Sequence, residues 1–497
     1  MIAKVLYIRL NGLDFQWELL DLIKLFFNGV EISFLHDQIP MDSTEMLLCG
    51  DLEIIDQTCS YHIKFSHGVD EWEHILPVPD RIPDKTQIAA RKSCKREIER
   101  GIYILLSKAT GKKLPWGILT GVRPVKIVHK LMEKGYEKSE INEHLQEKFF
   151  LSEGKAELLY KVATVEKALL ESARSNSVSV YIGIPFCISR CLYCSFTSYS
   201  IQQYSSLVNK YLDALKYELA SIGEMIRDRG MKIQSLYMGG GTPTSISADD
   251  LKDLLEFVEG CLDLSWLQEY TLEAGRPDSI DAGKLTVIKN SLVNRISINP
   301  QTMNNVTLEL IGRSHTGEDL VEAYNLARQM GFDNINMDVI VGLPGEGRDM
   351  FEETLRQICD MKPESLTVHT MAVKRASRLK AESVEYSLIP EYEAAEMINV
   401  SQVYASLMNM HPYYLYRQKN MLGNLENIGY CKPGFESTYN VQIMEERQSI
   451  LAAGAGAITK VVYPGENRNE RAFNVKGVEE YIERIDEMIY RKKLLFQ

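Results

Sequence analysis

The alternation of apolar and polar positions separates the first 176 residues from the rest of the chain. Up to about residue 70, four short segments alternate as strands do, and one apolar run has helical spacing. The strand segments are 4–10, 30–36, 45–55 and 61–66, and the helical run is 17–27. From about Ile88 to Ser177 the spacing is helical. We therefore predict an N-terminal domain, residues 1–176, with a small α/β unit followed by helices; its role stays open.

Strand and helix patterns alternate from Ser177 onwards. Strand segments occur at 178–184, 233–239, 269–275, 293–299, 335–343 and 365–371. Amphipathic helix patterns lie near 206–229, 248–262, 303–311, 317–331 and 349–360. Such alternation is typical of a parallel sheet with helical crossovers. The prediction is an α/β fold in which residues 177–384 form a partial (β/α)6 barrel.

Residues 385–497 show a mixed pattern. A helical segment begins at Glu391, a tyrosine-rich segment over 411–434 suggests strands, and the small residues of 452–460 permit close packing. The last segment, 478–496, has the spacing of one amphipathic helix. We predict a C-terminal mixed α/β domain, residues 385–497, that covers the active site.

The most informative chemistry lies in one stretch of 20 residues, Tyr181 to Ser200, which reads YIGIPFCISRCLYCSFTSYS. It holds Cys187, Cys191 and Cys194 in a CxxxCxxC spacing. Zinc and ferredoxin sites usually draw four protein ligands, so three thiolates in one loop would leave a coordination position for an external ligand. The alternative is three buried free cysteines that pack as small hydrophobic residues, which is how we interpret the six scattered cysteines elsewhere.

Glycines and polar residues lie at or near the exits of the other predicted strands. Ligands gather at the carboxyl ends of parallel strands in such folds, so these positions are expected to meet. The glycine run 239–241 would let a ligand approach the backbone, although a tight turn also explains it. Glu273, Gln301, Arg313 and Asp338 are each explained singly by structural pairing, but together they indicate one site.

The cysteine stretch resembles the radical S-adenosylmethionine (SAM) superfamily, in which such a loop holds a 4Fe-4S cluster and SAM ligates the remaining iron. The form YIxIPFCxxxCxYC is similar, more narrowly, to the oxygen-independent coproporphyrinogen III oxidases. The segments GGGTPT, EAGRPDSI, RISINPQTMNNVTLELIGRSHT and NINMDVIVGLPGE extend this likeness over about 179–380. The resemblance implies that the three cysteines bind the cluster and that an electron entering SAM yields methionine and a 5′-deoxyadenosyl radical. The protein then places the cofactor and excludes water and oxygen.

The resemblance also implies contacts to SAM. Tyr181, Gly240 and Glu273 would line the cluster-bound SAM, and Ile458 is a further expected contact from the C-terminal domain. Seven residues fall where the best-studied branch of the family binds a second SAM: Tyr193, Gly241, Thr242, Gln301, Arg313, Asp338 and Ala372. The expectation is therefore one SAM molecule, with a second as a hypothesis.

The family's reaction is the oxidative decarboxylation of coproporphyrinogen III to protoporphyrinogen IX in oxygen-independent haem biosynthesis. A hydrogen is taken from the β-carbon of a propionate, carbon dioxide leaves, and removal of one electron leaves a vinyl group. No base or nucleophile is needed, so no catalytic side chain is assigned. A reduced flavodoxin or ferredoxin-like protein is the expected electron donor.

The propionates of such a tetrapyrrole substrate need cationic partners, and guanidinium groups match carboxylates well. The segment MAVKRASRLK carries Lys374, Arg375, Arg378 and Lys380 directly after the sixth predicted strand. These residues are candidates for binding propionates, although a solvated helix face also explains their charges.

Two features depart from the best-known oxidases and resemble the longer HemZ-type coproporphyrinogen dehydrogenase branch. Phe196 stands where those oxidases have a further cysteine, and 186 residues precede Cys187. The alternatives are a haem-binding chaperone of the same family and a radical SAM enzyme that acts on another tetrapyrrole, such as haem. The chaperones carry a His-Asn-x-x-Tyr-Trp signature, whereas the comparable segment here runs from Tyr439-Asn440 to Ile443-Met444, which favours the enzyme.

The composition of the chain indicates the class of protein and the cellular compartment to expect. The net charge of −12 over 497 residues argues against a general nucleic-acid binder, and no apolar run reaches the ~18 residues of a membrane span. Arg9 and Asp14 would interrupt the core of a signal peptide. Nine cysteines, an odd number, fit a reducing compartment better than a disulfide framework. We therefore expect a cytoplasmic protein, and its oligomeric state stays open.

Overall fold

The computed structural model describes most of the chain. The described residues are 5–13, 15–27, 29–35, 46–55, 58–79, 87–121, 123–174, 176–372, 389–419, 421–463 and 468–496. The basic residues Lys374, Arg375, Arg378 and Lys380 lie outside them. The chain divides into two compact units, of which the first holds Met1–Pro124 and Lys130–Tyr160 and the second holds Val125–His129 and Lys161–Gln497.

The first unit contains a five-stranded sheet in the order β2-β1-β3-β4-β5. The strands are β1 (Val5–Leu10), β2 (Glu31–Phe34), β3 (Met46–Ile55), β4 (Thr58–His67) and β5 (Asp70–Pro77). Its helices include α1 (Gln16–Phe26), α2 (Ile88–Thr110) and α4 (Lys138–Phe149), and α3 (Val125–Glu133) and α5 (Glu153–Ser172) run across the boundaries between the units. Alternate residues of β1 are buried, as its sequence pattern predicts. The fifth strand, beyond residue 70, was not predicted.

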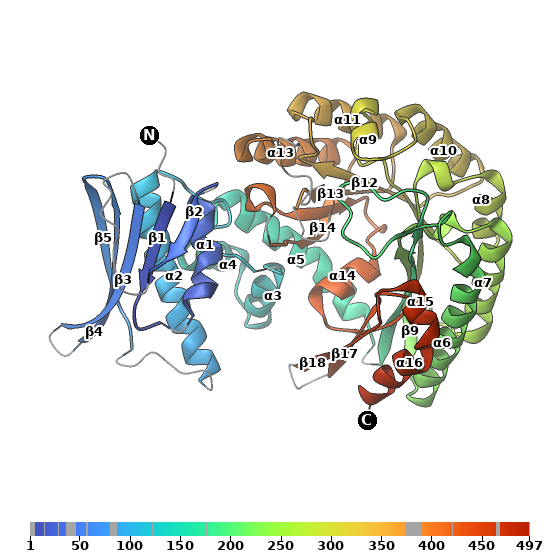
Figure 1. Cartoon of the computed structure of the whole chain (residues 1–497), viewed down its shortest axis with the longest axis horizontal. Coiled ribbons are helices and arrows are strands. Elements are labelled where there is room, and N and C mark those ends of the chain that lie inside the picture. Colours follow the sequence, from blue (N-terminus) through green and yellow to red (C-terminus); the bar gives the residue numbers. More distant parts are fainter. Residues whose placement is uncertain are drawn as a thin grey trace. The chain divides into compact units, whose positions relative to one another are not determined.

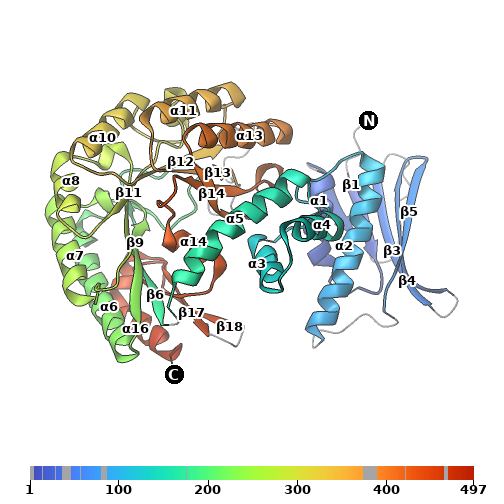
Figure 2. The ribbon, with the colours of Figure 1, turned by 180° about the vertical axis from the view of Figure 1, so that it is seen from behind.

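The second unit is built on six parallel strands, as the sequence predicts. In sheet order they are β6 (Ser177–Ile184), β9 (Lys232–Gly240), β10 (Glu269–Gly275), β11 (Arg295–Ile298), β12 (Ile335–Val341) and β13 (Ser365–Thr370). The helices between them are α6 (Val208–Asp228), α7 (Ala248–Cys261), α8 (Ala282–Lys289), α9 (Asn305–Leu310), α10 (Gly317–Gln329) and α11 (Arg348–Met361). These helices lie along the outside of the strands (Figures 1 and 2). The α/β prediction is confirmed, although α8 was not foreseen.

Strands from the C-terminal part of the chain extend both edges of this parallel sheet. On one edge, β15 (Asn427–Cys431) pairs antiparallel with β13 and with β14 (His411–Tyr416). On the other edge, β16 (Ser449–Ala453) runs parallel to β6, followed by β17 (Ile458–Tyr463) and β18 (Arg468–Phe473). The sheet of the described residues is therefore continuous across the boundary drawn at residue 385, and the three-domain division stays a prediction.

The other described α-helices of the second unit pack on its strands or on α6. They are α13 (Glu391–Leu407), α14 (Thr438–Glu445), α15 (Val478–Glu483) and α16 (Ile485–Leu494). The prediction of one helix over 478–496 was wrong, because Arg484, with φ −112° and ψ 24°, leaves the helical conformation between α15 and α16. Among the described helices, none is both long enough and apolar enough to cross a lipid bilayer.

Candidate cofactor site

The cysteine loop follows the first strand of the parallel sheet and is fixed at its base and near its middle. At the base, β7 (Phe186–Cys187) pairs with β8 (Tyr199–Ser200), and the N–H of Ile201 donates to the carbonyl of Cys187 at 2.9 Å. In the middle, Leu192 is buried in an apolar cluster, and its N–H donates to the carbonyl of Ile311 at 3.0 Å. The other buried members of the cluster are Leu308, Ile311, Ile340, Leu343 and Met371. These contacts therefore fix the conformation of the loop that carries the three thiols.

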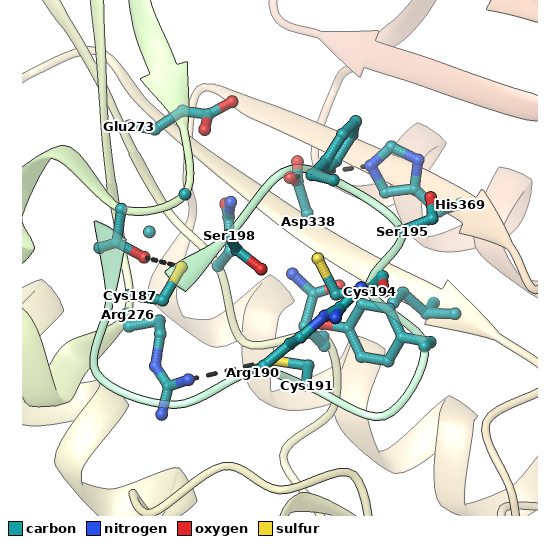
Figure 3. Close-up of a pocket in the computed structure, with 18 of the residues that line it drawn as sticks. Cys187, Arg190, Cys191, Cys194, Ser195, Ser198, Glu273, Arg276, Asp338 and His369 are labelled. Carbon is teal, nitrogen blue, oxygen red and sulfur yellow. Dashed lines mark hydrogen bonds and ion pairs between the residues drawn. The ribbon is translucent and has the colours of Figure 1, made fainter. Parts of the chain in front are cut away.

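The three thiols line one pocket (Figure 3). The hydroxyl of Thr242 lies 3.6 Å from the sulfur of Cys187, and Nη1 of Arg276 lies 3.9 Å from that of Cys191. Burial raises the pKa of the Cys187 thiol to about 11 and also raises the pKa of Cys194. A coordinated metal removes the thiol proton, and donors around the sulfurs then tune the reduction potential of a cluster.

Arg276 connects the cysteine loop to the turn after β10. Its Nη1 donates to the carbonyl and the hydroxyl oxygen of Ser189, at 3.0 and 2.9 Å. The other guanidinium nitrogens pair with Asp278, at 3.0 and 2.7 Å. The segment EAGRPDSI contains this arginine, which was not predicted as a site residue. Its position directly after the end of a predicted strand could have indicated that it lies near the site.

The glycine run after β9 brings the backbone against the cysteine loop. A Cβ atom on Gly241 would lie 2.5 Å from the carbonyl oxygen of Phe186 and 3.0 Å from the sulfur of Cys187. Gly240 has φ +109°, in a region that side chains disfavour. The N–H of Gly241 donates to the carbonyl of Ile184 at 2.7 Å, which fixes the turn. The close approach therefore requires glycine here, and a tight turn alone does not account for it.

Glu273 presents a carboxyl group across the pocket from the cysteines (Figure 3). It accepts hydrogen bonds from the Tyr237 hydroxyl and the N–H of Gly240. Burial nevertheless raises its pKa to about 7, and the charge of Asp338 adds to the rise. A carboxyl group with a pKa near 7 can be protonated at neutral pH, and it can then donate a hydrogen bond to a ligand as well as accept one.

Asp338 forms a second polar group in the pocket, together with His369, which was not predicted as a site residue. Nδ2 of Asn336 donates to Asp338 at 2.7 Å, and Nε2 of His369 lies 3.7 Å from its other oxygen. Burial acts to raise the pKa of Asp338, but the contacts to His369, Asn336 and Thr367 outweigh it and lower the pKa. Nδ1 of His369 lies 3.4 Å from the hydroxyl of Tyr416. A carboxylate kept charged in a pocket can bind a cationic or hydroxyl-bearing ligand.

Arg313 lies between the cysteine loop and the exit of β11. Its Nη1 donates to the carbonyl of Asn299 at 2.7 Å, and its Nη2 to the hydroxyl of Tyr193 at 3.3 Å. Its Nε has no hydrogen-bond partner among the described residues. A buried guanidinium with a spare donor is suited to an anionic group of a ligand.

The structure brings most of the predicted site residues into one pocket, with a cavity volume of about 230 Å³. They are Cys187, Cys191, Cys194, Tyr193, Gly240, Gly241, Thr242, Glu273, Gln301, Arg313, Asp338 and Ala372. Tyr181 lines an adjoining cavity that shares Gly240 with this pocket. Ile458, 45% exposed at the start of β17, lines neither cavity. His369, Tyr416 and Asn427 line the pocket without having been predicted.

Comparison with known proteins agrees with this geometry. Residues 181–358 match the model of the radical SAM superfamily. The chain is 42% identical to the oxygen-independent coproporphyrinogen-III oxidase-like protein HemZ of Bacillus subtilis (strain 168) over 408 residues, 81% of each chain. The chain belongs to the oxygen-independent coproporphyrinogen III oxidase-like family of the radical SAM superfamily. The resemblance to the HemZ-type branch is thereby confirmed.

Other members of this family extend the comparison. The haem chaperone HemW of B. subtilis is 33% identical over 318 residues, which cover 62% of this chain and 76% of that protein. The solved structure of coproporphyrinogen III oxidase (HemN) from Escherichia coli has the same fold. Its TM-score is 0.52 at 21% identity, and the match covers 66% of this chain and 73% of that one.

Membership of the radical SAM superfamily implies a 4Fe-4S cluster and SAM as cofactors. The residues present fit both groups. Three thiols face one pocket, which leaves a fourth ligand position for SAM, and the glycine turn keeps backbone close to Cys187. The spare donor of Arg313 and the carboxyl of Glu273 offer partners for the charged groups of SAM.

Proposed function

We propose that this chain catalyses the oxidative decarboxylation of two propionates of coproporphyrinogen III to vinyl groups, which gives protoporphyrinogen IX. At each propionate a hydrogen atom leaves the β-carbon, the carboxylate departs as carbon dioxide, and one electron passes to an acceptor. The remaining two carbons then form the vinyl double bond. We further propose that a flavodoxin or ferredoxin-like protein supplies the electron that starts each cycle.

The observation that carries the proposal is the meeting of the thiol loop with two further polar groups in one pocket. Glu273 and the Asp338–His369 pair lie across the pocket from Cys187, Cys191 and Cys194 (Figure 3). The name of HemZ as coproporphyrinogen-III oxidase-like supports the choice of substrate.

In this proposal the side chains bind and orient, because the cofactors supply the reactive species. When bound, the cluster and SAM together provide a carbon-centred radical that takes the hydrogen atom from the substrate. Cys187, Cys191 and Cys194 hold the cluster, and Glu273 pairs with a hydroxyl or amino group of SAM. Arg313 and Asp338 carry opposite charges in the same pocket, which suits a second SAM with its own carboxylate and sulfonium.

The haem chaperone is the competing function, since the chain is also 33% identical to HemW of B. subtilis over 318 residues. The position comparable to the first residue of the chaperone signature is Tyr439, which is 6% exposed. Its ring stacks on Tyr237 at 4.5 Å and on Tyr181 at 6.3 Å between centroids. A tyrosine buried in a stack offers no imidazole to a haem iron, which supports the enzyme over the chaperone.

Anaerobic turnover tests the proposal. The cluster-reconstituted protein is incubated with SAM, a reductant and either coproporphyrinogen III or haem, and products are identified by mass spectrometry. Vinyl products and carbon dioxide from coproporphyrinogen III support the proposal. Tight haem binding without SAM cleavage would instead select the chaperone, and haem ring opening would select another tetrapyrrole substrate. Equilibrium dialysis of labelled SAM against the same protein counts the bound molecules and decides between one and two.

A further inference from the structure

Three side chains of different ligand chemistry meet at the end of the β14–β15 hairpin. They are His411, at the start of β14, Cys431, at the end of β15, and Glu436, in the segment that leads to α14. One ligand atom from each lies within 4.8 Å of the others. The resemblance to radical SAM enzymes does not involve these residues, and none of them lines the cofactor pocket.

Strand pairing and one turn produce this meeting. His411 and Cys431 are directly opposite each other in the antiparallel β14–β15 pair. Beyond Cys431 the chain turns at Gly434, which has φ +86°. The N–H of Gly434 donates to both carboxylate oxygens of Glu436, at 3.3 and 3.1 Å, and so directs this side chain back toward His411. The three groups are therefore fixed by backbone geometry.

The imidazole nitrogen Nε2 of His411 faces both partners. It lies 2.9 Å from Oε1 of Glu436 and 3.9 Å from the sulfur of Cys431. Around a tetrahedral zinc ion, the bond lengths of such ligands place N and S about 3.6 Å apart and N and O about 3.4 Å apart. The observed separations lie within about 0.5 Å of these values, so small side-chain rotations would open space for the ion.

We propose that His411, Cys431 and Glu436 bind a divalent metal ion of the zinc class. Zinc takes nitrogen, sulfur and oxygen ligands together, and three protein ligands leave a fourth position for water. The side chains of His411 and Glu436 are 30% and 16% exposed, so solvent reaches this position, whereas Cys431 is fully buried beneath them. An ion pair between His411 and Glu436 explains the contact between these two side chains. It does not explain why the Cys431 thiol lies near the same imidazole nitrogen.

The proposed metal is separate from the iron–sulfur cluster and stabilises one wall of the pocket. Tyr416 and Asn427, at the other ends of β14 and β15, line the cofactor pocket. The two ends of these strands are about 15 Å apart at roughly 3.3 Å per residue. A bound ion would tie the segment around Glu436 to the hairpin and so resist fraying of the strands that carry Tyr416 and Asn427.

Zinc K-edge X-ray absorption of the cluster-loaded, full-length protein tests the site, because this edge is distinct from that of iron. The protein is supplied with one equivalent of zinc and then dialysed. We expect about one zinc to be retained per chain, with one sulfur near 2.3 Å and the remaining ligands nitrogen or oxygen. The Cys431→Ser variant should lose the sulfur shell, and the Glu436→Gln variant should bind zinc at least about tenfold more weakly. The Cys359→Ser variant, on α11, is the matched control and should behave as the unchanged protein.

Two results would overturn the proposal. The first is that no zinc is retained above the level of a protein without the site, measured by mass spectrometry of the metal. The second is that the sulfur shell persists in Cys431→Ser, since zinc would then be held by other thiols. Glu436 lies in a partly exposed loop, so its glutamine variant tests the site even if the buried Cys431→Ser variant fails to fold, which circular dichroism would reveal.

Discussion

The pocket has two sides, and they are built differently. On the side of the cysteine loop, backbone contacts fix the glycine turn: the N–H groups of Gly241 and Thr242 donate to the carbonyls of Ile184 and Phe186, at 2.7 and 2.8 Å. On the side of β12 and β13, side chains do so, since Asn336 donates to Asp338 and accepts from Thr367. A Cβ atom at Gly241 would therefore clash with the loop on the first side, whereas the second side depends on a few polar atoms.

The largest expected effect comes from removing a thiol on the backbone side. Cys191→Ala should abolish cluster assembly and release of 5′-deoxyadenosine, because two thiolates do not hold a 4Fe-4S cluster stably. Iron and sulfide analysis after anaerobic reconstitution, with electron paramagnetic resonance of the reduced protein, measures the loss. Cys359→Ala is the control and should keep the full cluster. A Cys191→Ala protein that assembles a normal cluster would contradict the whole assignment of the loop.

The next effect tests the close approach of the glycine turn. Gly241→Ala places a methyl group 2.5 Å from the carbonyl of Phe186, so backbone must shift. We expect a loss of about 1–3 kcal/mol in unfolding free energy and a markedly reduced cluster content. Gly260→Ala, where the structure shows nothing within 4 Å of the new atom, is the matched control. If the two variants have equal unfolding free energies in denaturant titrations and equal iron contents, the glycine turn does not require close backbone packing.

A substitution on the side-chain side should separate ligand binding from cluster assembly. Asp338→Asn removes the charge that faces His369, and charge-assisted hydrogen bonds contribute about 1.5–3 kcal/mol. On the proposed function, we expect turnover of coproporphyrinogen III to fall roughly ten- to a hundredfold, with iron content unchanged. Asp333→Asn, an exposed position just before the same strand, is the control. Loss of the cluster in Asp338→Asn would place this residue among the supports of the loop instead.

The smallest effect is a pH dependence of stability that depends on Glu273. Its pKa is raised from 4.5 in the unfolded chain to about 7 in the folded protein, so folding favours the protonated carboxyl. The stability it contributes is complete below about pH 4.5 and is lost as pH rises toward 7. We expect Glu273→Gln to flatten this fall, by a change in Tm on the order of a few degrees between pH 5 and 8.

Thermal unfolding of the cofactor-free protein measures this difference. Glu346, whose pKa is also raised to about 7, is present in both proteins, so the difference between their curves isolates Glu273. Parallel curves for the two proteins would mean that Glu273 is already charged in the folded state at pH 5.

The contrast between the two sides also explains what could be predicted from the sequence. The three cluster cysteines and the glycine run each lie within a short contiguous motif. Their proximity could therefore be predicted from the order of the strands that carry these motifs. His369 and Asn427 reach the pocket through strand registers, with His369 opposite Ile340 and Asn427 at the end of an antiparallel strand. A register between distant segments is not encoded in either segment alone.

The secondary structure was likewise only partly predictable from the sequence. The strand pattern of 269–275 matched β10 at both ends, because its buried run is bounded by polar residues on either side. The short helix α8 was missed because Gly283 and a weak apolar stripe leave little helical pattern in its eight residues. The ligand roles of all the predicted site residues stay predictions, and Tyr181 and Ile458 do not line the main pocket.

The position of β16 has a consequence for how the protein is made. This strand lies beside β6, which leads into the cysteine loop, yet it belongs to the last tenth of the chain. A nascent polypeptide therefore exposes an uncovered parallel edge next to its most oxygen-sensitive segment until translation is almost complete. The topology favours delivery of iron and sulfide after the chain has left the ribosome. Only then are both strands that flank β6, namely β9 and β16, in place.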